Sequence, residues 1–221
     1  MTGTETTRVD PATYDRVAVR IERRSLLVVG GLPGAGKSTL LRGLEADVPV
    51  TVLDADQVRA RLRRLLPAGT PYSWYRPFVH LLQLARLVAG AFGAAGPLVV
   101  HDPATGPLAR TAFRALGALT GRTRHLLWLD CTPEAALAGQ RARGRVLLGW
   151  SFTRHARNAP RLRGRLLAGD TPSGWHSGSI IDRAAARRGL RLQVREGVSG
   201  TGDPARSVPR PPVTHRKGEN Q

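Results

Sequence analysis

A run of nine residues in this chain has the composition of a phosphate-binding loop. Residues 31–39 read Gly-Leu-Pro-Gly-Ala-Gly-Lys-Ser-Thr and fit the pattern G-x-x-x-x-G-K-[S/T]. Glycines allow a tight turn whose N–H groups approach phosphate oxygens, Lys37 can place its ammonium between the β- and γ-phosphates of a nucleotide, and Ser38 can ligate Mg²⁺. We therefore predict a site for ATP and Mg²⁺. The predicted contacts are Gly31, Leu32, Pro33, Gly34, Ala35, Gly36, Lys37, Ser38 and Thr39.

The residues on either side of this loop have the patterns of a strand and a helix. Residues 25–30 form a short apolar, β-branched run that is typical of a buried parallel strand, and residues 39–44 return to a helical apolar spacing. Strand, glycine loop and helix is the context that the motif requires. The alternative is a glycine-rich turn in a chain with 25 glycines, but lysine occurs only at positions 37 and 217, so a chance match is rare.

Apolar runs alternate with helical segments along the rest of the chain. The expected strands are 25–30, 50–53, 98–101, 125–130 and 190–194. The expected helices are 57–66, 79–92, 107–119, the arginine-dense segment 140–165 and 180–188, with a loop at 169–178 and a short helix or lead-in at 14–21. This alternation predicts an α/β fold with a parallel sheet and right-handed crossovers.

Four aspartates follow the expected strands directly. Asp54 and Asp56 come after the second strand, Asp102 after the third and Asp130 at the end of the fourth. Because ligands of parallel α/β sheets bind at the carboxyl ends of the strands, these acids are expected beside the glycine loop.

Length and charge restrict the class of protein further. We expect a lead-in at 1–24, one domain at 25–198 and a disordered basic tail at 199–221. No apolar run has membrane-span length, no secretion signal is visible, and the single Cys131 excludes an internal disulfide, so a cytoplasmic protein is expected. The net charge of +18 attracts nucleic acid, but the chain is also rich in Ala, Gly and Pro, so a GC-rich gene is a second explanation and both stay open.

Three motifs together resemble the small P-loop kinases, which include polynucleotide 5′-hydroxyl kinases, chloramphenicol phosphotransferase, gluconate-type kinases and the zeta-toxin group. They are the loop at 31–39, the segment Leu-Asp-Ala-Asp-Gln-Val-Arg at 53–59 and the segment Gln-Arg-Ala-Arg-Gly-Arg at 140–145. The resemblance covers residues 25–195. It implies the P-loop NTPase fold, with a five-stranded parallel sheet in the order 2-3-1-4-5, helices on both faces and an arginine-rich helical lid.

The resemblance also implies roles for individual residues. Asp56 matches the carboxylate that accepts the proton of the substrate hydroxyl, and Arg59 matches the arginine that grips the substrate, with Asp54 beside them. The alternative for either acid is to cap the following helix. Arg143, and next Arg141, match lid arginines that neutralise charge on the γ-phosphate, the alternative being a solvated arginine-rich face.

Two further assignments concern the metal and the acceptor. Asp102 is favoured as the acid that holds Mg²⁺, with Asp130 as its rival. The aromatic cluster Tyr72, Trp74 and Tyr75 is placed to bind an acceptor by stacking, although a small hydrophobic patch is the simpler interpretation.

The expected function is an ATP- and Mg²⁺-dependent kinase acting on a hydroxyl acceptor. A nucleic-acid 5′-hydroxyl and a small molecule both fit as acceptor, and the oligomeric state is left open. Two other classes compete with this prediction: an NTPase switch that hydrolyses without an acceptor, and a nucleic-acid-binding protein with a vestigial nucleotide loop.

Overall fold

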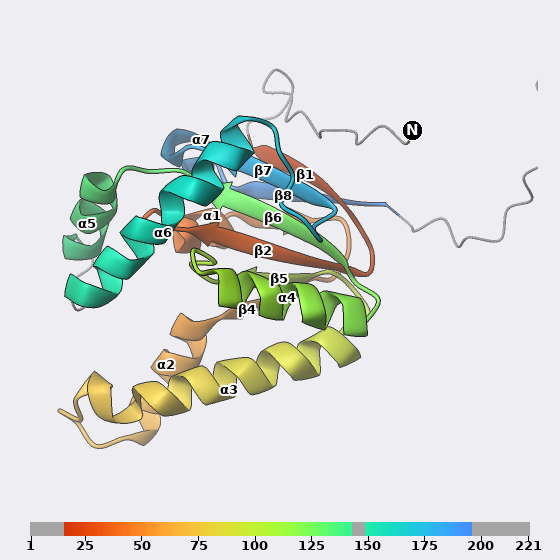
Figure 1. Ribbon diagram of the computed structural model, residues 1–221. Coiled ribbons are helices and arrows are strands. Elements are labelled where there is room, and N and C mark those ends of the chain that lie inside the picture. Colours follow the sequence, from red (N-terminus) through yellow and green to blue (C-terminus); the bar gives the residue numbers. More distant parts are fainter. Residues whose placement is uncertain (1–15, 143–148, 196–221) are drawn as a thin grey trace, which may run out of the picture.

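The computed structural model describes residues 16–142 and 149–195. Its centre is a sheet of parallel strands with helices on both faces, so the predicted α/β class is confirmed (Figure 1). In order across the sheet, the strands are β4 (Thr51–Asp54), β5 (Leu98–His101), β2 (Ser25–Gly31), β6 (Thr123–Leu129) and β7 (Ser177–Ile181). Every residue of β2 is buried, because parallel neighbours flank it on both sides and helices cover the sheet.

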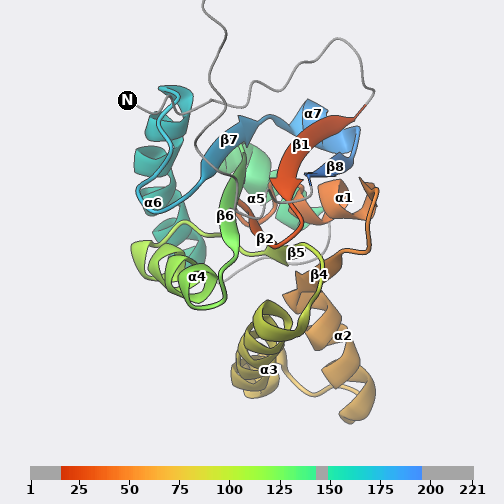
Figure 2. The same ribbon diagram turned by 90° about the vertical axis from the view of Figure 1, so that its right-hand side faces the viewer.

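The helices form groups around this sheet (Figure 2). On one side lie α4 (Pro107–Leu119) and α6 (Gly149–Leu167), and on the other side lie α1 (Lys37–Arg42) and α7 (Arg183–Arg187). Two helices, α2 (Ala55–Leu65) and α3 (Tyr72–Gly93), form a hairpin beyond the β4 edge, and α5 (Pro133–Arg141) lies near the carboxyl end of β2.

A second sheet corrects two predictions about the ends of the domain. It consists of β1 (Val17–Glu22), β8 (Leu190–Arg195) and β3 (Leu44–Ala46), all parallel. The short helix offered as one possibility for 14–21 is wrong for residues 17–21, which belong to β1, because their alternating burial suits a strand with one face against the core. Residues 190–194 are a strand, but they pair with β1 and β3 rather than closing the main sheet.

The fifth place in the main sheet is taken by β7, where a loop and the start of a helix were expected. β7 pairs with β6 along its whole length, from His125 opposite Ser177 to Leu129 opposite Ile181. The helix expected at 180–188 shrinks to α7, which Asp182 caps by accepting a hydrogen bond from the Ala185 N–H. In the predicted order 2-3-1-4-5, residues 190–194 were expected as the fifth strand. Residues 177–181 occupy that position instead.

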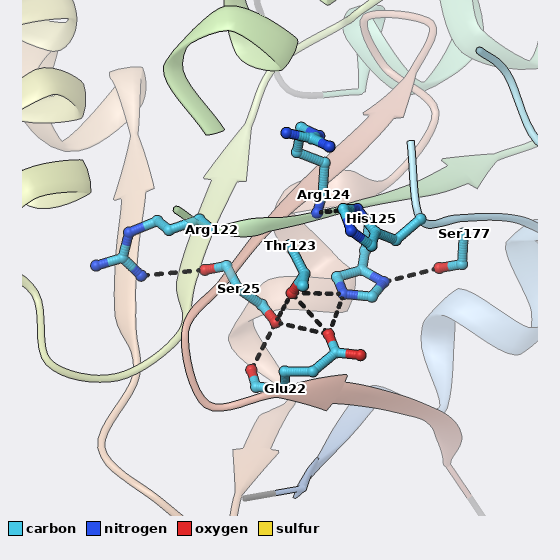
Figure 3. Close-up of polar contacts among 8 residues, drawn as sticks. Glu22, Ser25, Arg122, Thr123, Arg124, His125 and Ser177 are labelled. Atoms are coloured by element: carbon cyan, nitrogen blue, oxygen red, sulfur yellow. Dashed lines mark hydrogen bonds and ion pairs between the residues drawn. The ribbon is translucent and has the colours of Figure 1, made fainter. Parts of the chain in front are cut away.

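A polar cluster joins both sheets at the amino ends of β2 and β6, opposite the glycine loop (Figure 3). The Nε2 of buried His125 lies 2.8 Å from Glu22 Oε2, and the Thr123 hydroxyl donates to the same oxygen at 2.6 Å. On the other side of the ring, His125 Nδ1 lies 2.8 Å from the Ser177 hydroxyl. Because an ionised carboxylate only accepts hydrogen bonds, Nε2 carries the proton in this arrangement. The cluster ties the end of β1 to β6 and β7.

A buried arginine fastens the far end of α3 to the sheet. Arg122, only 1% exposed, precedes β6 and directs its guanidinium at backbone carbonyls. The accepting carbonyls belong to Ser25, Gly90, Ala91, Ala94 and Gly96. Carbonyls in the last turn of a helix have no intrahelical partner, so Arg122 supplies donors where α3 ends.

Candidate nucleotide and phosphoryl-transfer site

The glycine loop has the backbone conformation that a phosphate-binding turn requires. Gly31, Gly34 and Gly36 have φ angles of 136°, 94° and 121°, a region that side chains disfavour. A Cβ on Gly34 would lie 2.0 Å from the carbonyl oxygen of Ala136 in α5, and the Gln140 amide donates to the Pro33 carbonyl at 2.9 Å. The loop is therefore packed directly against α5.

Lys37 is held at the centre of this loop. Its side chain is 4% exposed, and Nζ donates to the carbonyls of Gly31 at 2.7 Å and Leu32 at 3.0 Å. No side chain caps the start of α1, where a helix presents backbone N–H groups and the positive end of its dipole. A buried ammonium beside uncapped N–H groups suits the phosphates of a nucleotide, so the residues fit the predicted ligand.

The two acids after β4 have different contacts. Asp54 caps α2 by accepting a hydrogen bond from the Asp56 N–H at 2.9 Å, and its other oxygen lies 2.9 Å from His101 Nδ1. The pKa of the Asp54 carboxyl is lowered overall. Burial raises this pKa, but His101, the hydrogen bond from the Asp56 N–H and the charge of Lys37 together lower it by more. The capping role that the sequence left open between the two acids thus falls to Asp54, while half-buried Asp56 lies in the first turn.

The two acids proposed for the metal also differ. Asp130 receives a two-pronged hydrogen bond from Arg163 of α6, at 2.8 and 2.9 Å, so both of its oxygens are engaged. Asp102 accepts one hydrogen bond, from the Ala104 N–H at 2.7 Å, in the turn that follows β5. This contrast favours Asp102 over Asp130 for Mg²⁺.

A metal at this site would depend on few protein ligands. Within the described residues, no group of three or more His, Cys, Asp or Glu side chains could hold a metal ion. Mg²⁺ commonly binds through one or two protein oxygens, substrate phosphates and water, and Ser38 with Asp102 matches that pattern. The residues present therefore fit Mg²⁺ that arrives with a nucleotide.

Residues that the sequence did not single out also reach this site. His155 of α6 places Nδ1 2.7 Å from the hydroxyl of Thr105, a residue that is 2% exposed in the turn after β5. The pKa of the His155 imidazole is lowered, chiefly by burial. The charge of Lys37 lowers this pKa further, and the carboxylate of Asp102 raises it by a smaller amount. No sequence signal identified His155, because it lies in an arginine-rich helix with no motif of its own.

The turn between β5 and α4 is strained and closely attached to the glycine loop. Ala104 adopts a positive φ of 50° although it carries a Cβ and is buried. The Gly31 N–H donates to the Pro103 carbonyl at 3.1 Å, and Arg110 of α4 donates to the carbonyls of Ala104 and Thr105. The contacts hold Asp102 and Thr105 beside the loop.

Only one of the two named lid arginines is described by the structure. Arg141 lies exposed in the last turn of α5, the helix that packs on the glycine loop. Arg143, together with Arg145, falls in 143–148 and lies outside the described residues. A catalytic arginine in this segment therefore stays a prediction.

The described part of the chain contains cavities at the hairpin and beside the glycine loop. One, of about 500 Å³, lies at the turn of the α2–α3 hairpin, where the Arg59 guanidinium stacks 4.1 Å from the centre of the Tyr72 ring. Tyr72 packs edge-on against Tyr75, whereas Trp74 is exposed and does not line this cavity. The remaining lining residues are Arg63, Leu66, Pro67, Ala68, Gly69 and Thr70.

The second cavity, of about 230 Å³, lies beside the glycine loop and between α1, α5 and α7. Small residues and two arginines line it. They are Ala35, Gly36, Thr39, Gly139, Ala142, Arg183, Ala186 and Arg187.

Comparison with known proteins supports the fold. Residues 26–148 match the model of a family described as an AAA domain. A candidate kinase from Chloroflexus aurantiacus has 14% identity and a TM-score of 0.51 over 73% of this chain and 86% of its own. A chain of the PezAT chromosomal toxin–antitoxin system of Streptococcus pneumoniae has 18% identity and a TM-score of 0.50 over 74% and 69%. The predicted resemblance to P-loop kinases is thereby confirmed for the fold.

No curated protein matches the chain significantly. None of the helices in the described part of the chain is both long enough and apolar enough to cross a membrane.

Proposed function

Because the chain belongs to the AAA-domain family, we propose that it is an ATP-dependent kinase that transfers the γ-phosphoryl group of ATP to a hydroxyl acceptor. One observation carries this proposal: His101 of β5 pairs with Val29 of β2 on one side and with Asp54 of β4 on the other, so the glycine loop and the acids after β4 lie at the same edge of the sheet. Asp56 stands in the first turn of α2, next to the residue that caps it.

The glycine loop would bind the phosphates of ATP. Lys37 and the N–H groups at the start of α1 would neutralise the β- and γ-phosphates, and Ser38 with Asp102 would hold Mg²⁺. The bound Mg²⁺ supplies charge neutralisation on the phosphates. The cavity beside Thr39 is a candidate place for the nucleoside, since its small residues leave room for a planar ring.

Asp56 would prepare the acceptor. A carboxylate at this place can accept the proton of an acceptor hydroxyl as its oxygen attacks the γ-phosphorus and the bond to ADP breaks. Arg59 and Arg63 line the cavity at the turn of the hairpin, together with Tyr72 and Tyr75. Guanidinium groups beside tyrosine rings favour an acceptor that carries an anionic or planar group.

Arg141, in the last turn of α5, or Arg143, two residues later in the sequence, would contact the γ-phosphate. The contact between α5 and the glycine loop supports this placement, because it brings the end of α5 into the neighbourhood of the phosphates. A planar cation there would stabilise the charge that spreads over the γ-oxygens during transfer.

The test is a transfer assay with γ-labelled ATP and Mg²⁺. The acceptors are 5′-hydroxyl DNA and RNA oligonucleotides and a pool of sugars, nucleosides and hydroxylated antibiotics. We expect Lys37→Ala to abolish both nucleotide binding and transfer. Asp56→Asn should retain nucleotide binding but lose transfer by about 10²–10⁴-fold, because it removes only the proton acceptor.

The remaining outcomes separate the competing functions. Release of free phosphate that no acceptor changes would indicate an NTPase switch. Salt-dependent nucleic-acid binding that survives Lys37→Ala, without transfer, would indicate a binding protein with a vestigial loop. Equal loss of nucleotide binding in Asp56→Asn would contradict the role proposed for Asp56.

A further inference from the structure

Helix α3 has one face against the protein and one without a partner. Tyr75 and Val79 pack against Val58 of α2, and Ala91 joins the main core. The rest of the helix exposes seven large apolar side chains, each between 41% and 76% exposed. They are Trp74, Phe78, Leu81, Leu82, Leu84, Val88 and Phe92. Single exposed apolar residues are ordinary, but a contiguous row of this size marks an interaction surface.

Five of these exposed residues, together with exposed Ala85, follow the spacing of a helix–helix seam. Trp74, Phe78, Leu81, Ala85, Val88 and Phe92 succeed one another in alternating steps of four and three. This is the heptad spacing with which two helices interlock side chains along a shared stripe. We refer to these six residues as the α3 stripe.

The α3 stripe is symmetric about the level of residue 83. A two-fold axis at that level would place Trp74 opposite Phe92 of a second copy, Phe78 opposite Val88, and Leu81 opposite Ala85. Each pair joins a larger side chain to a smaller one, which lets the two helices interdigitate. A two-fold interface needs such a self-complementary surface, because the same patch is used on both subunits.

The exposed area supplies most of what a stable pair needs. Large apolar side chains have full areas of about 200 Å², so the five in the α3 stripe present on the order of 600 Å². Specific interfaces bury about 800 Å² on each partner. The α3 stripe therefore provides most of an ordinary dimer interface, and residues beside it would provide the rest.

Charge points to the same occupant. The chain carries a net charge of +18, yet no exposed residue of α3 is Asp, Glu, Lys or Arg, and Arg76 and Arg86 are both half-buried. Two copies can therefore meet along this face without placing like charges in the seam. Residues 1–15 and 196–221 contain no Leu, Ile, Phe or Trp, so their sequences offer no row of large apolar side chains that matches the stripe.

We propose that α3 pairs antiparallel with α3 of a second copy of the chain, across a two-fold axis at the level of residue 83, to form a homodimer. The pairing would brace the α2–α3 hairpin, since α3 begins at Tyr72, which lines the cavity at the hairpin turn. This inference rests on the exposed face of α3 and does not depend on kinase activity.

The first test is the mass of the full chain in solution, measured by sedimentation or light scattering between 1 and about 100 μM, where interfaces of this size associate. We expect twice the chain mass of 23.8 kDa. Leu81→Glu should raise the dimer dissociation constant roughly 30-fold or more, because the two glutamates would face the seam beside the axis. Leu108→Glu is the matched control, as Leu108 is also largely exposed, at 79% against 63% for Leu81, but lies on α4.

The second test fixes the register. In a Cys131→Ser background, the double variant Leu81→Cys/Ala85→Cys should form an intermolecular disulfide under mild oxidation, and Leu108→Cys should not. Circular dichroism and thermal melting verify that each variant is folded. A monomer throughout the concentration range would overturn the proposal. So would Leu81-dependent binding to phosphatidylglycerol vesicles without dimerisation, which would assign the face to a membrane surface.

Discussion

Asp102 and Asp130 follow the strands on either side of β2, and their contacts differ at the level of single atoms. Arg163 occupies both oxygens of Asp130, which fastens α6 to the end of β6. Asp102 Oδ1 receives only the Ala104 N–H. The sequence placed both acids at strand ends, but only the arrival of Arg163 from a distant helix distinguishes a tethering acid from a candidate metal ligand.

This difference predicts opposite results for two equivalent substitutions. Asp102→Asn keeps an oxygen for the Ala104 N–H but loses the negative charge, so we expect the Mg²⁺ concentration for half-maximal activity to rise at least about 10-fold. Asp130→Asn should leave that concentration unchanged and lower the free energy of unfolding only slightly, because the Arg163 side chain is 49% exposed. Mg²⁺ titrations and melting curves measure both. A raised Mg²⁺ requirement in Asp130→Asn alone would reverse the assignment.

At the scale of elements, the polar cluster around Glu22 and His125 decides how β1 is attached to the main sheet. The hydrogen bond from His125 is the largest cause that lowers the pKa of the Glu22 carboxyl, and Thr123 contributes while burial opposes the shift. A carboxyl whose pKa is lowered by folding stabilises the fold above its ordinary pKa of 4.5 and loses that contribution as the pH falls below it.

We therefore expect the free energy of unfolding to fall on acidification below about pH 4.5, in part through Glu22. Glu22→Gln should cost roughly 1 kcal/mol at pH 7, a modest value because this side chain is partly exposed. The difference between wild type and variant should shrink as the pH is lowered, since protonated Glu22 resembles glutamine. Urea denaturation at several pH values measures it. A difference independent of pH would mean that the hydrogen-bonded carboxylate contributes nothing specific.

At the scale of the whole molecule, the glycine loop is the meeting point of segments from across the chain. Lys37 donates to the carbonyls of Gly31 and Leu32 in this loop, the Gly31 N–H donates to the Pro103 carbonyl after β5, and the Gln140 amide of α5 donates to the Pro33 carbonyl. A ligand that neutralises the charge of Lys37 would therefore bridge several parts of the fold, and its binding should stabilise the molecule as a unit.

We expect a nonhydrolysable ATP analogue with Mg²⁺ at about 100 times its Kd to add about 2.7 kcal/mol to the free energy of unfolding. For a chain of this size that corresponds to an increase in Tm of roughly 5–10 °C. Lys37→Ala should melt without this increase. An equal increase in the variant would place the nucleotide away from the loop.

The sequence was most informative where a structure depends on adjacent residues. The strand, glycine loop and helix from residue 25 to 42 follow from a contiguous motif, because glycine conformations and apolar spacing are local properties. The carboxyl-edge placement of Asp54, Asp102 and Asp130 followed from the alternation of strands and helices. These features needed no knowledge of which distant segments pack together.

Only the tertiary structure decided which distant segments pair. Residues 177–181, rather than 190–194, complete the main sheet, because strand order depends on long-range packing that local patterns do not encode. For the same reason, the capping role of Asp54, the bond between Asp130 and Arg163 and the arrival of His155 at Thr105 became visible only in the fold. The sequence by itself determined a glycine loop with the phosphate-binding pattern on a parallel sheet. The contacts of Asp54, Asp130 and His155 depend on segments that come together only in the folded chain.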